Sequence, residues 1–212
     1  MRTLLLLAAL ALPATPALAQ EKAAAAAQQT APDPAAATKR TEELIAAFRA
    51  VPSGADAKAS AAAFAKLDGF FDFDTIRTAP ISNRLDRFSP AQRKEFEQLF
   101  EKLVRENAYP SSGDFFRKAK LEIVGGKAKG EVTVVTLSAL DPADGMETEV
   151  GVHWKEVGGA LKVVDVDFDG DSLIVDYRNQ FTGIIDRDGV DALLSRAKER
   201  LAELQKPKAK KE

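Results

Sequence analysis

Four aspartates and a glycine are spaced like the ligands of a calcium-binding loop. Asp165, Asp167 and Asp169 occupy alternate positions, Gly170 follows them, and Asp176 comes six residues after the glycine. Loops of the form D-x-D-x-D-G-x₅-E place carboxylates at these positions because Ca²⁺ prefers oxygen ligands. The chain matches the first, third, fifth and sixth positions of this template, with aspartate in place of glutamate at the twelfth. The spacing therefore makes a calcium site the first hypothesis.

The same residues fit a half-buried β-strand. Val164, Val166 and Phe168 alternate with the aspartates, as in a strand whose apolar side chains face a core and whose carboxylates face water. Calcium loops begin at the end of a helix, but nothing before Asp165 has a helical pattern. Leu173, at the ninth template position, offers no side-chain oxygen. We therefore predict a strand and no metal site, and a calcium-dependent module stays the alternative.

The residue inventory excludes several kinds of catalysis. The chain has no cysteine and one histidine, so thiol nucleophiles, thiolate metal sites and multi-histidine zinc sites are excluded. It has neither a G-x-S-x-G motif nor a glycine-rich phosphate loop. His153 lies among glutamates on the polar side of a predicted strand, which is typical of a solvated or salt-bridged histidine. We predict that the protein is not an enzyme and has no cofactor.

The N-terminal residues predict export. Residues 1–19 combine Arg2, an uncharged apolar run at 4–12 and small residues at 17–19, which is the pattern of a secretory signal peptide. Its removal would change the formal net charge from −2 to −3, because Arg2 is its one charged residue. Residues 20–38 are rich in alanine and lack large apolar side chains, which indicates a flexible leader. We expect a soluble periplasmic protein.

The rest of the chain is expected to form one domain, residues 39–205, followed by a charged tail at 206–212. Its composition, 45% hydrophobic and 29% charged, is typical of a globular protein. A net charge close to zero gives no basic face for nucleic acid.

Helical periodicity covers the first part of this domain and its end. Ser89 marks the clearest helix start, because Pro90 suits the first helical position and Gln92 completes a capping box. Asp171 or Ser172 can cap a later helix in the same way. The pattern predicts helices at residues 41–51, 61–67, 89–109, 173–184 and from 188 onward, with a short helix or turn at 70–76.

Between these helices the hydrophobic period changes from near 3.6 to 2. Glycine pairs at 125–126 and 158–159, and the sequence DPADG at 141–145, predict hairpin turns. Consecutive hairpins form an antiparallel sheet, and helices must cover one of its faces, so the expected fold class is α+β. The predicted strands, about four, are residues 120–124, 131–140, 146–155 and 161–169.

The C-terminal part resembles the signature of the MlaC family, the periplasmic phospholipid-binding proteins also called toluene-tolerance proteins. Upstream, the segments "FFDFDTI" and "FSPAQRKEFEQLFEKLVRENAY" are also similar to that family. Leu161 departs from the pattern, which usually has tryptophan there, and "TAPISNRLDRF" replaces an expected G-R-x-W. The matching C-terminal residues are Lys162, Val163, Asp165, Val166, Gly170, Ser172, Leu173, Tyr177, Arg178, Gln180, Phe181, Ile184, Ile185, Gly189 and Leu193.

The resemblance implies a curved antiparallel sheet wrapped by helices around a deep apolar cavity, an NTF2-like or MlaC-like fold. It also implies a carrier that moves phospholipid between an outer-membrane lipoprotein complex and an inner-membrane complex with an MCE-domain ring and an ABC transporter. Such a carrier needs apolar volume and no catalytic group. A carrier of another apolar lipid, such as a hopanoid, stays the alternative; a hydrolase using buried carboxylates is the least favoured.

Apolar groups from four elements are expected to converge around the acyl chains. Trp154 fits either this cavity wall or a filled core. Arg178 is the candidate for the headgroup phosphate, since arginine suits bidentate contact with it, with a fold-stabilising salt bridge as the alternative. The predicted cavity residues are Phe100, Leu103, Val150, Val152, Trp154, Val164, Val166, Phe168, Leu173, Tyr177 and Phe181.

Overall fold

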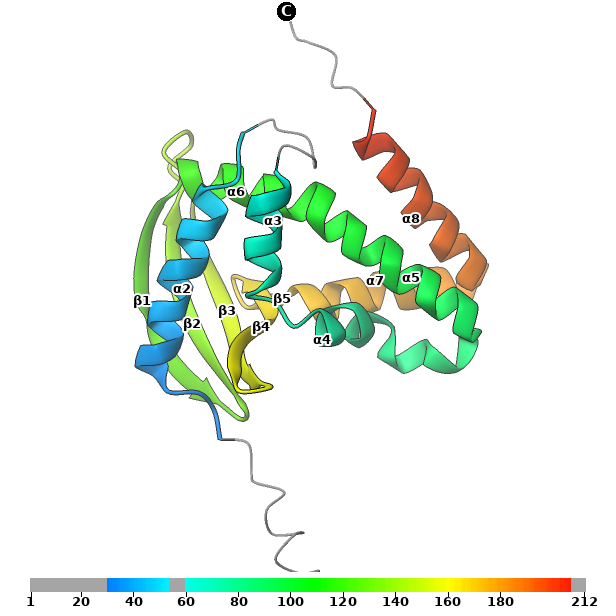
Figure 1. Cartoon of the computed structure of the whole chain (residues 1–212), viewed down its shortest axis with the longest axis horizontal. Helices are drawn as coiled ribbons and strands as arrows, with labels where there is room; N and C mark the ends of the chain where they lie inside the picture. The colour runs from blue at the N-terminus through cyan, green and yellow to red at the C-terminus, as the bar shows by residue number, and fades with distance from the viewer. Residues whose placement is uncertain (1–29, 54–59, 207–212) are drawn as a thin grey trace, which may run out of the picture.

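The structure, a computed structural model, describes residues 30–53 and 60–206 (Figure 1). The expected signal peptide, most of the expected leader and nearly all of the charged tail lie outside the described residues. The helical elements are α2 (Pro34–Arg49), α3 (Ala61–Asp68), α4 (Phe73–Thr78), the 3₁₀ segment η1 (Ala79–Arg87), α5 (Pro90–Leu103), the π segment η2 (Val104–Ala108), α6 (Tyr109–Lys118), α7 (Leu173–Asp188) and α8 (Val190–Leu204).

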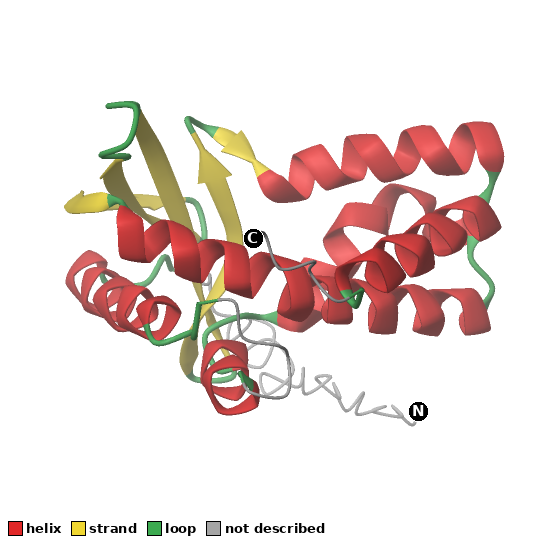
Figure 2. Cartoon of the chain, turned by 90° about the horizontal axis from the view of Figure 1, so that it is seen from above, coloured by secondary structure: helices red, strands yellow, loops and turns green. Residues whose placement is uncertain are grey.

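The strands form one curved antiparallel sheet in chain order, β1-β2-β3-β4-β5, so the predicted α+β class is confirmed. Figures 1 and 2 show the sheet at one end of the molecule, with α5, α7 and α8 extending beyond it. Gly158 and Gly159 make the predicted turn, both with positive φ. The strands are β1 (Lys120–Lys129), β2 (Val132–Leu140), β3 (Glu147–Val157), β4 (Ala160–Phe168) and the two-residue β5 (Asp171–Ser172).

The turn predicted at Gly125 and Gly126 is wrong. The chain continues as β1 to Lys129 and turns after it, and the glycine pair lies within the strand, beside a register shift between Ile123 and Gly125. Gly126 lets a helix approach the sheet closely, since a Cβ there would lie 3.1 Å from the Pro34 carbonyl oxygen. Gly125 therefore lies at a bulge, and Gly126 lies at a close packing contact. A pair of glycines in the sequence does not distinguish these roles from a turn.

Helix α2 begins at Pro34, seven residues before the start that the apolar pattern predicts. The Asp33 carboxylate accepts a hydrogen bond from the Ala36 N–H at 2.9 Å and caps the helix, and proline suits the first position. Ala37 and Thr41 are fully buried. Small residues at these positions let α2 lie close across β1 and β2 (Figure 1).

Helix α5 has the predicted start, and the continuous helical stretch from α5 to α6 ends at Lys118, later than predicted. Ser89 and Gln92 form both hydrogen bonds of the capping box. The helix continues past the Tyr109-Pro110 pair, because the π segment η2 joins α5 to α6. Pro110 is the second residue after this segment, where the regular hydrogen-bond ladder is already interrupted and a missing N–H is tolerated.

Two separate hydrophobic clusters form the interior. The sheet-side cluster joins α2, α3 and α6 to the inner face of the sheet, with Trp154 and Phe48 among its buried residues. The helical cluster joins η1, α5, α7 and α8, with Phe96 and Leu194 among its buried residues. Val104, in the π segment, packs partly against both. Among the helices described in residues 30–53 and 60–206, none is long and apolar enough to cross a membrane.

Candidate ligand-binding cavity

An apolar cavity of about 380 Å³ lies between the sheet and the helices. This volume is within the range of small-molecule binding sites. Its residues come from both hydrophobic clusters and from the helix that joins them. They are Leu44 and Phe48 (α2), Phe71, Phe73, Ile76 and Pro80 (the α4 region and η1), Phe100, Val104, Ala108, Tyr109, Ser111, Ser112, Phe115 and Phe116 (α5 to α6), Val150, Val152, Val163, Asp165, Val166 and Phe168 (β3 and β4), and Leu173, Ile174 and Tyr177 (α7).

The cavity is elongated along the joined helix. Phe100 lines one part of it and Phe115 another. At a rise of 1.5 Å per residue, this stretch of helix spans roughly 20 Å. Phe168 and Tyr177 line the cavity and are 38% and 37% exposed, so they mark a place where it reaches the surface. The shape suits an extended chain more than a compact ligand.

Most of the predicted cavity residues do line the cavity, although their role in binding stays a prediction. Leu103 and Phe181 do not, because they pack within the helical cluster. Trp154 and Val164 are not lining residues either. Those that the structure brings together around the cavity are Phe100, Val150, Val152, Val166, Phe168, Leu173 and Tyr177.

A β-bulge in β4 explains the position of Val164. The register shifts so that His153 pairs with Asp165 while Trp154 pairs with Val163, which leaves Val164 as the extra residue. Val163 and Val166 therefore both line the cavity, although they are three positions apart. A strict period of two cannot predict this change of face.

Trp154 belongs to the filled part of the sheet-side cluster. Its side chain is completely buried, and its indole Nε1–H donates a hydrogen bond of 2.8 Å to Thr41 Oγ1. The Thr41 hydroxyl in turn donates to the Ala37 carbonyl oxygen at 2.9 Å. Of the two interpretations of Trp154 that the sequence allows, the structure thus favours the core residue.

Arg178 does not lie in the cavity wall. Its Nε–H donates to the Ala79 carbonyl oxygen at 3.2 Å, which ties α7 to η1. This contact resembles the fold-stabilising alternative, although the partner is a backbone carbonyl and not a carboxylate. In the described part of the chain, no lysine, arginine or histidine lines the cavity.

The sequence interpretation missed the aromatic residues of the opposite wall. Phe71, Phe73 and Tyr109 line the cavity from the helical side. Phe71 and Phe73 lie within residues 70–76, where the apolar pattern predicts only a short helix or turn. Phe48 lies within the helix predicted at residues 41–51, yet nothing in the apolar pattern of that helix indicates that the residue faces an empty volume.

Tyr109 connects the cavity wall to a chain of polar contacts. Burial, together with the neighbouring Asp68 carboxylate, raises the pKa of Tyr109 well above its usual range, so its hydroxyl stays protonated and donates to Asp68 at 3.0 Å. Arg105 also binds Asp68, at 2.8 Å, and these hydrogen bonds raise the pKa of Arg105. The buried hydroxyl thus has a partner inside the protein and leaves an apolar ring for the cavity.

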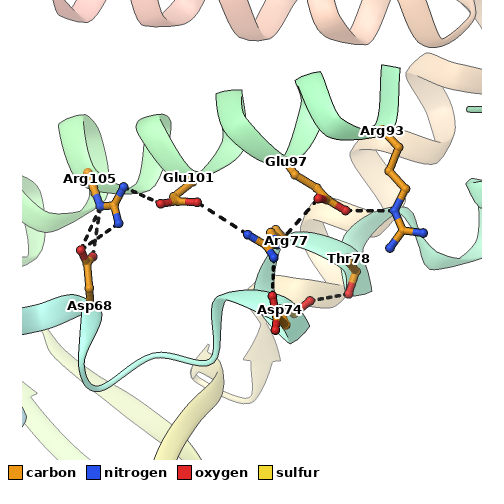
Figure 3. A network of polar contacts seen from close by, with 8 residues as sticks. All are labelled: Asp68, Asp74, Arg77, Thr78, Arg93, Glu97, Glu101 and Arg105. Atoms are coloured by element: carbon orange, nitrogen blue, oxygen red, sulfur yellow. Dashed lines mark hydrogen bonds and ion pairs between the residues drawn. The ribbon is translucent and has the colours of Figure 1, made fainter. Parts of the chain in front are cut away.

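The same network fastens α3 and α4 to α5 (Figure 3). Glu101 bridges Arg105, at 2.5 Å, and Arg77, at 3.7 Å, and Arg77 also pairs with Asp74. None of these charged side chains is among the lining residues. These charged groups therefore hold the cavity wall from outside, while its inner surface is mostly apolar.

The carboxylates of Asp165, Asp167 and Asp169 bind separate partners. Asp165 contacts the start of α7, Asp167 pairs with His153 at 2.6 Å, and Asp169, with a φ of 52°, accepts a hydrogen bond from the Glu149 N–H at 2.9 Å. The predicted strand through Asp165 and Asp167 is confirmed, but these two carboxylates are not simply solvated. His153 Nε2 contacts the Asp167 carboxylate, so this histidine is not simply solvated.

We predict that calcium does not bind tightly to this segment. Converging these carboxylates on one ion would require breaking the strand pairing and the contacts just described. In the described residues no group of three or more potential ligands is placed to hold a metal ion. Calorimetry should therefore detect no micromolar binding of calcium. A micromolar signal that disappears in the variant Asp167→Ala with Asp169→Ala would contradict this expectation.

The fold and the cavity define a class: an α+β protein in which a curved sheet and helices enclose an elongated apolar cavity. The chain belongs to the MlaC protein family, whose profile matches residues 36–199. The structure of a phospholipid-binding protein from Ralstonia solanacearum in complex with a phospholipid is similar in fold, with a TM-score of 0.65 and 19% sequence identity. The match covers 81% of this chain and 98% of that one. No match is found among curated proteins.

Proposed function

We propose that the protein is a phospholipid-binding carrier, and the observation that carries this proposal is the elongated apolar cavity between the two hydrophobic clusters. Membership of the MlaC family supports it. The similar fold of a protein solved with a phospholipid supports it as well.

The lining determines which part of the lipid is enclosed. Removing one methylene group from water contributes about 0.8 kcal/mol, so aromatic and aliphatic walls bind acyl chains by burial alone. Asp165 is the one charged residue among the described lining residues, and it is an anion. A phosphate inside would lack a cationic partner and would be costly to desolvate. We therefore expect the headgroup near Phe168 and Tyr177, in contact with water.

The proposal extends to transport. In it, the protein acts in the periplasm after export by the residue 1–19 signal peptide. It moves phospholipid between an outer-membrane lipoprotein complex and an inner-membrane MCE-domain and ABC transporter complex. This role requires no enzymatic activity and no cofactor, since acyl chains are transferred without a change in covalent bonds. The resemblance of the chain to its family supports these partners.

Protein purified from cells is expected to carry about one glycerophospholipid per molecule, because the described residues enclose an apolar cavity of about 380 Å³. Mass spectrometry of an organic extract from gently purified protein measures the cargo. Incubation with phosphatidylethanolamine vesicles, followed by separation, measures uptake. A hopanoid in the extract in place of phospholipid would show that the cargo is a hopanoid. Empty protein that also takes no lipid from vesicles would end the carrier proposal.

A further inference from the structure

Asp165 has an unusual position at the edge of the sheet. On one side of it, the Val163 backbone bonds to the Phe70 carbonyl and the Asp72 N–H, at 2.8 and 2.9 Å. On the other side, Asp167 pairs with Ser172 of β5. Asp165 thus occupies the part of the β4 edge between these two pairings, within the bulge and on the cavity wall.

The Asp165 carboxylate binds the first turn of α7. Its Oδ2 accepts from Ser172 Oγ at 2.5 Å, and its Oδ1 accepts from the Ile174 N–H at 3.3 Å and from the adjacent Val166 N–H at 2.8 Å. Ser172 Oγ also accepts from the Val175 N–H at 3.1 Å. The carboxylate thus binds the Ile174 N–H directly and the Val175 N–H through the serine, and both are first-turn donors without a partner inside the helix. A negative charge at this end is also favoured by the helix dipole.

This contact joins the two halves of the cavity wall. Helix α7 packs mainly with η1 and α8 in the helical cluster, while β4 belongs to the sheet. Leu173, Ile174 and Tyr177 line the cavity from α7, and Val166 and Phe168 line it from β4. The distance between these two walls depends on where the first turn of α7 is held.

We infer that Asp165 is a positioning residue that sets the width of the cavity by holding the start of α7 against the bulged edge of β4. It does so through its carboxylate and not by contact with the ligand. Without the carboxylate, the start of α7 loses a charge-assisted anchor and moves relative to the sheet, and an enclosed lipid is held less firmly.

The matched control is Asp167, two positions away on the same strand. Its carboxylate is 13% exposed, and it pairs with His153 instead of α7. Asp167 is not a lining residue. Loss of either carboxylate is expected to lower the melting temperature, but loss of Asp165 alone should affect the retention of lipid.

The decisive measurement is the transfer of pyrene-labelled phosphatidylcholine from loaded protein to excess unlabelled phosphatidylcholine vesicles. In Asp165→Ala we expect transfer to be roughly ten times faster, the size of effect that losing a charged cap contact can give. Asp167→Ala should keep the wild-type rate. An unchanged rate in Asp165→Ala, or equal acceleration in both variants, would overturn the inference. If Asp165→Ala does not fold, Ser172→Ala is measured in its place, because it removes the hydrogen-bond donor to Asp165 Oδ2. Faster transfer than in the wild type is expected, and an unchanged rate would overturn the inference.

A second readout does not need lipid, which matters because the rate measurement rests on the proposed carrier function. The chain has no cysteine, so spin labels can be placed at Glu122→Cys on β1 and Asn179→Cys on α7, both exposed. Asp165→Ala should broaden or shift the distance distribution between the labels, and Asp167→Ala should not. An unchanged distribution in Asp165→Ala would contradict the positioning role. Failure of the wild type to take up lipid would contradict only the proposed function.

Discussion

Val152→Trp is expected to abolish lipid binding while leaving the ligand-free protein about as stable as the wild type. Val152 lines the cavity and is 2% exposed, so an indole at this position extends into the volume of about 380 Å³. The added ring occupies space meant for acyl chains and gains apolar contacts there. Uptake from vesicles and the melting temperature of lipid-free protein measure the two effects.

Val135→Trp is the matched control for this variant. Val135 and Val152 are paired across β2 and β3, and both are almost completely buried. Val135 does not line the cavity, so a larger side chain there overpacks a filled core and should cost about 1–3 kcal/mol. A large loss of stability in Val152→Trp, with lipid bound per folded molecule unchanged, would show that Val152 does not face the binding volume.

Trp154→Ala is expected to lower the free energy of unfolding by about 3–5 kcal/mol, the usual cost of removing a large buried aromatic side chain. Total stabilities of domains are about 5–15 kcal/mol, so this loss removes a large fraction of the whole. Because Trp154 packs in the filled core, lipid bound per folded molecule should not change. Denaturant unfolding and vesicle uptake measure the two quantities.

Thr41→Val tests the same site if Trp154→Ala does not fold. It keeps the side-chain volume nearly constant but leaves the indole N–H without its acceptor, which should cost about 1–3 kcal/mol. A loss of lipid binding in either variant, measured on folded protein, would place Trp154 in the binding wall after all.

Helix caps and tight turns could be predicted from the sequence, because they depend on residues that are close together in the chain. Ser89 with Gln92, Ser172 as a helix cap, and the Gly158-Gly159 turn all form as predicted. Each depends on residues within three positions of one another, so the fold class and most element boundaries follow from the sequence.

Features that depend on distant packing were not predictable in this way. The bulge at Val164 reverses the face of part of β4, and it forms between strands whose pairing no local pattern specifies. The continuation of the helix through Pro110 depends on a π segment that packs against both clusters. The apolar stripe of a helix, such as that of Phe100 in α5 or Phe181 in α7, has the same sequence pattern whether it faces a filled core or an empty volume. The cavity could therefore be predicted from the family resemblance but not from periodicity.

The separation of the interior into two clusters has a consequence for how the protein responds to cargo. A lipid between them would contact side chains of both and would bind the folded state far better than the unfolded chain. By mass action, ligand at 100 times its dissociation constant then adds about 2.7 kcal/mol to the free energy of unfolding. Loaded and empty molecules would thus differ in their resistance to proteases, which cleave the opened chain. Cells could remove idle carriers faster than working ones without any dedicated signal.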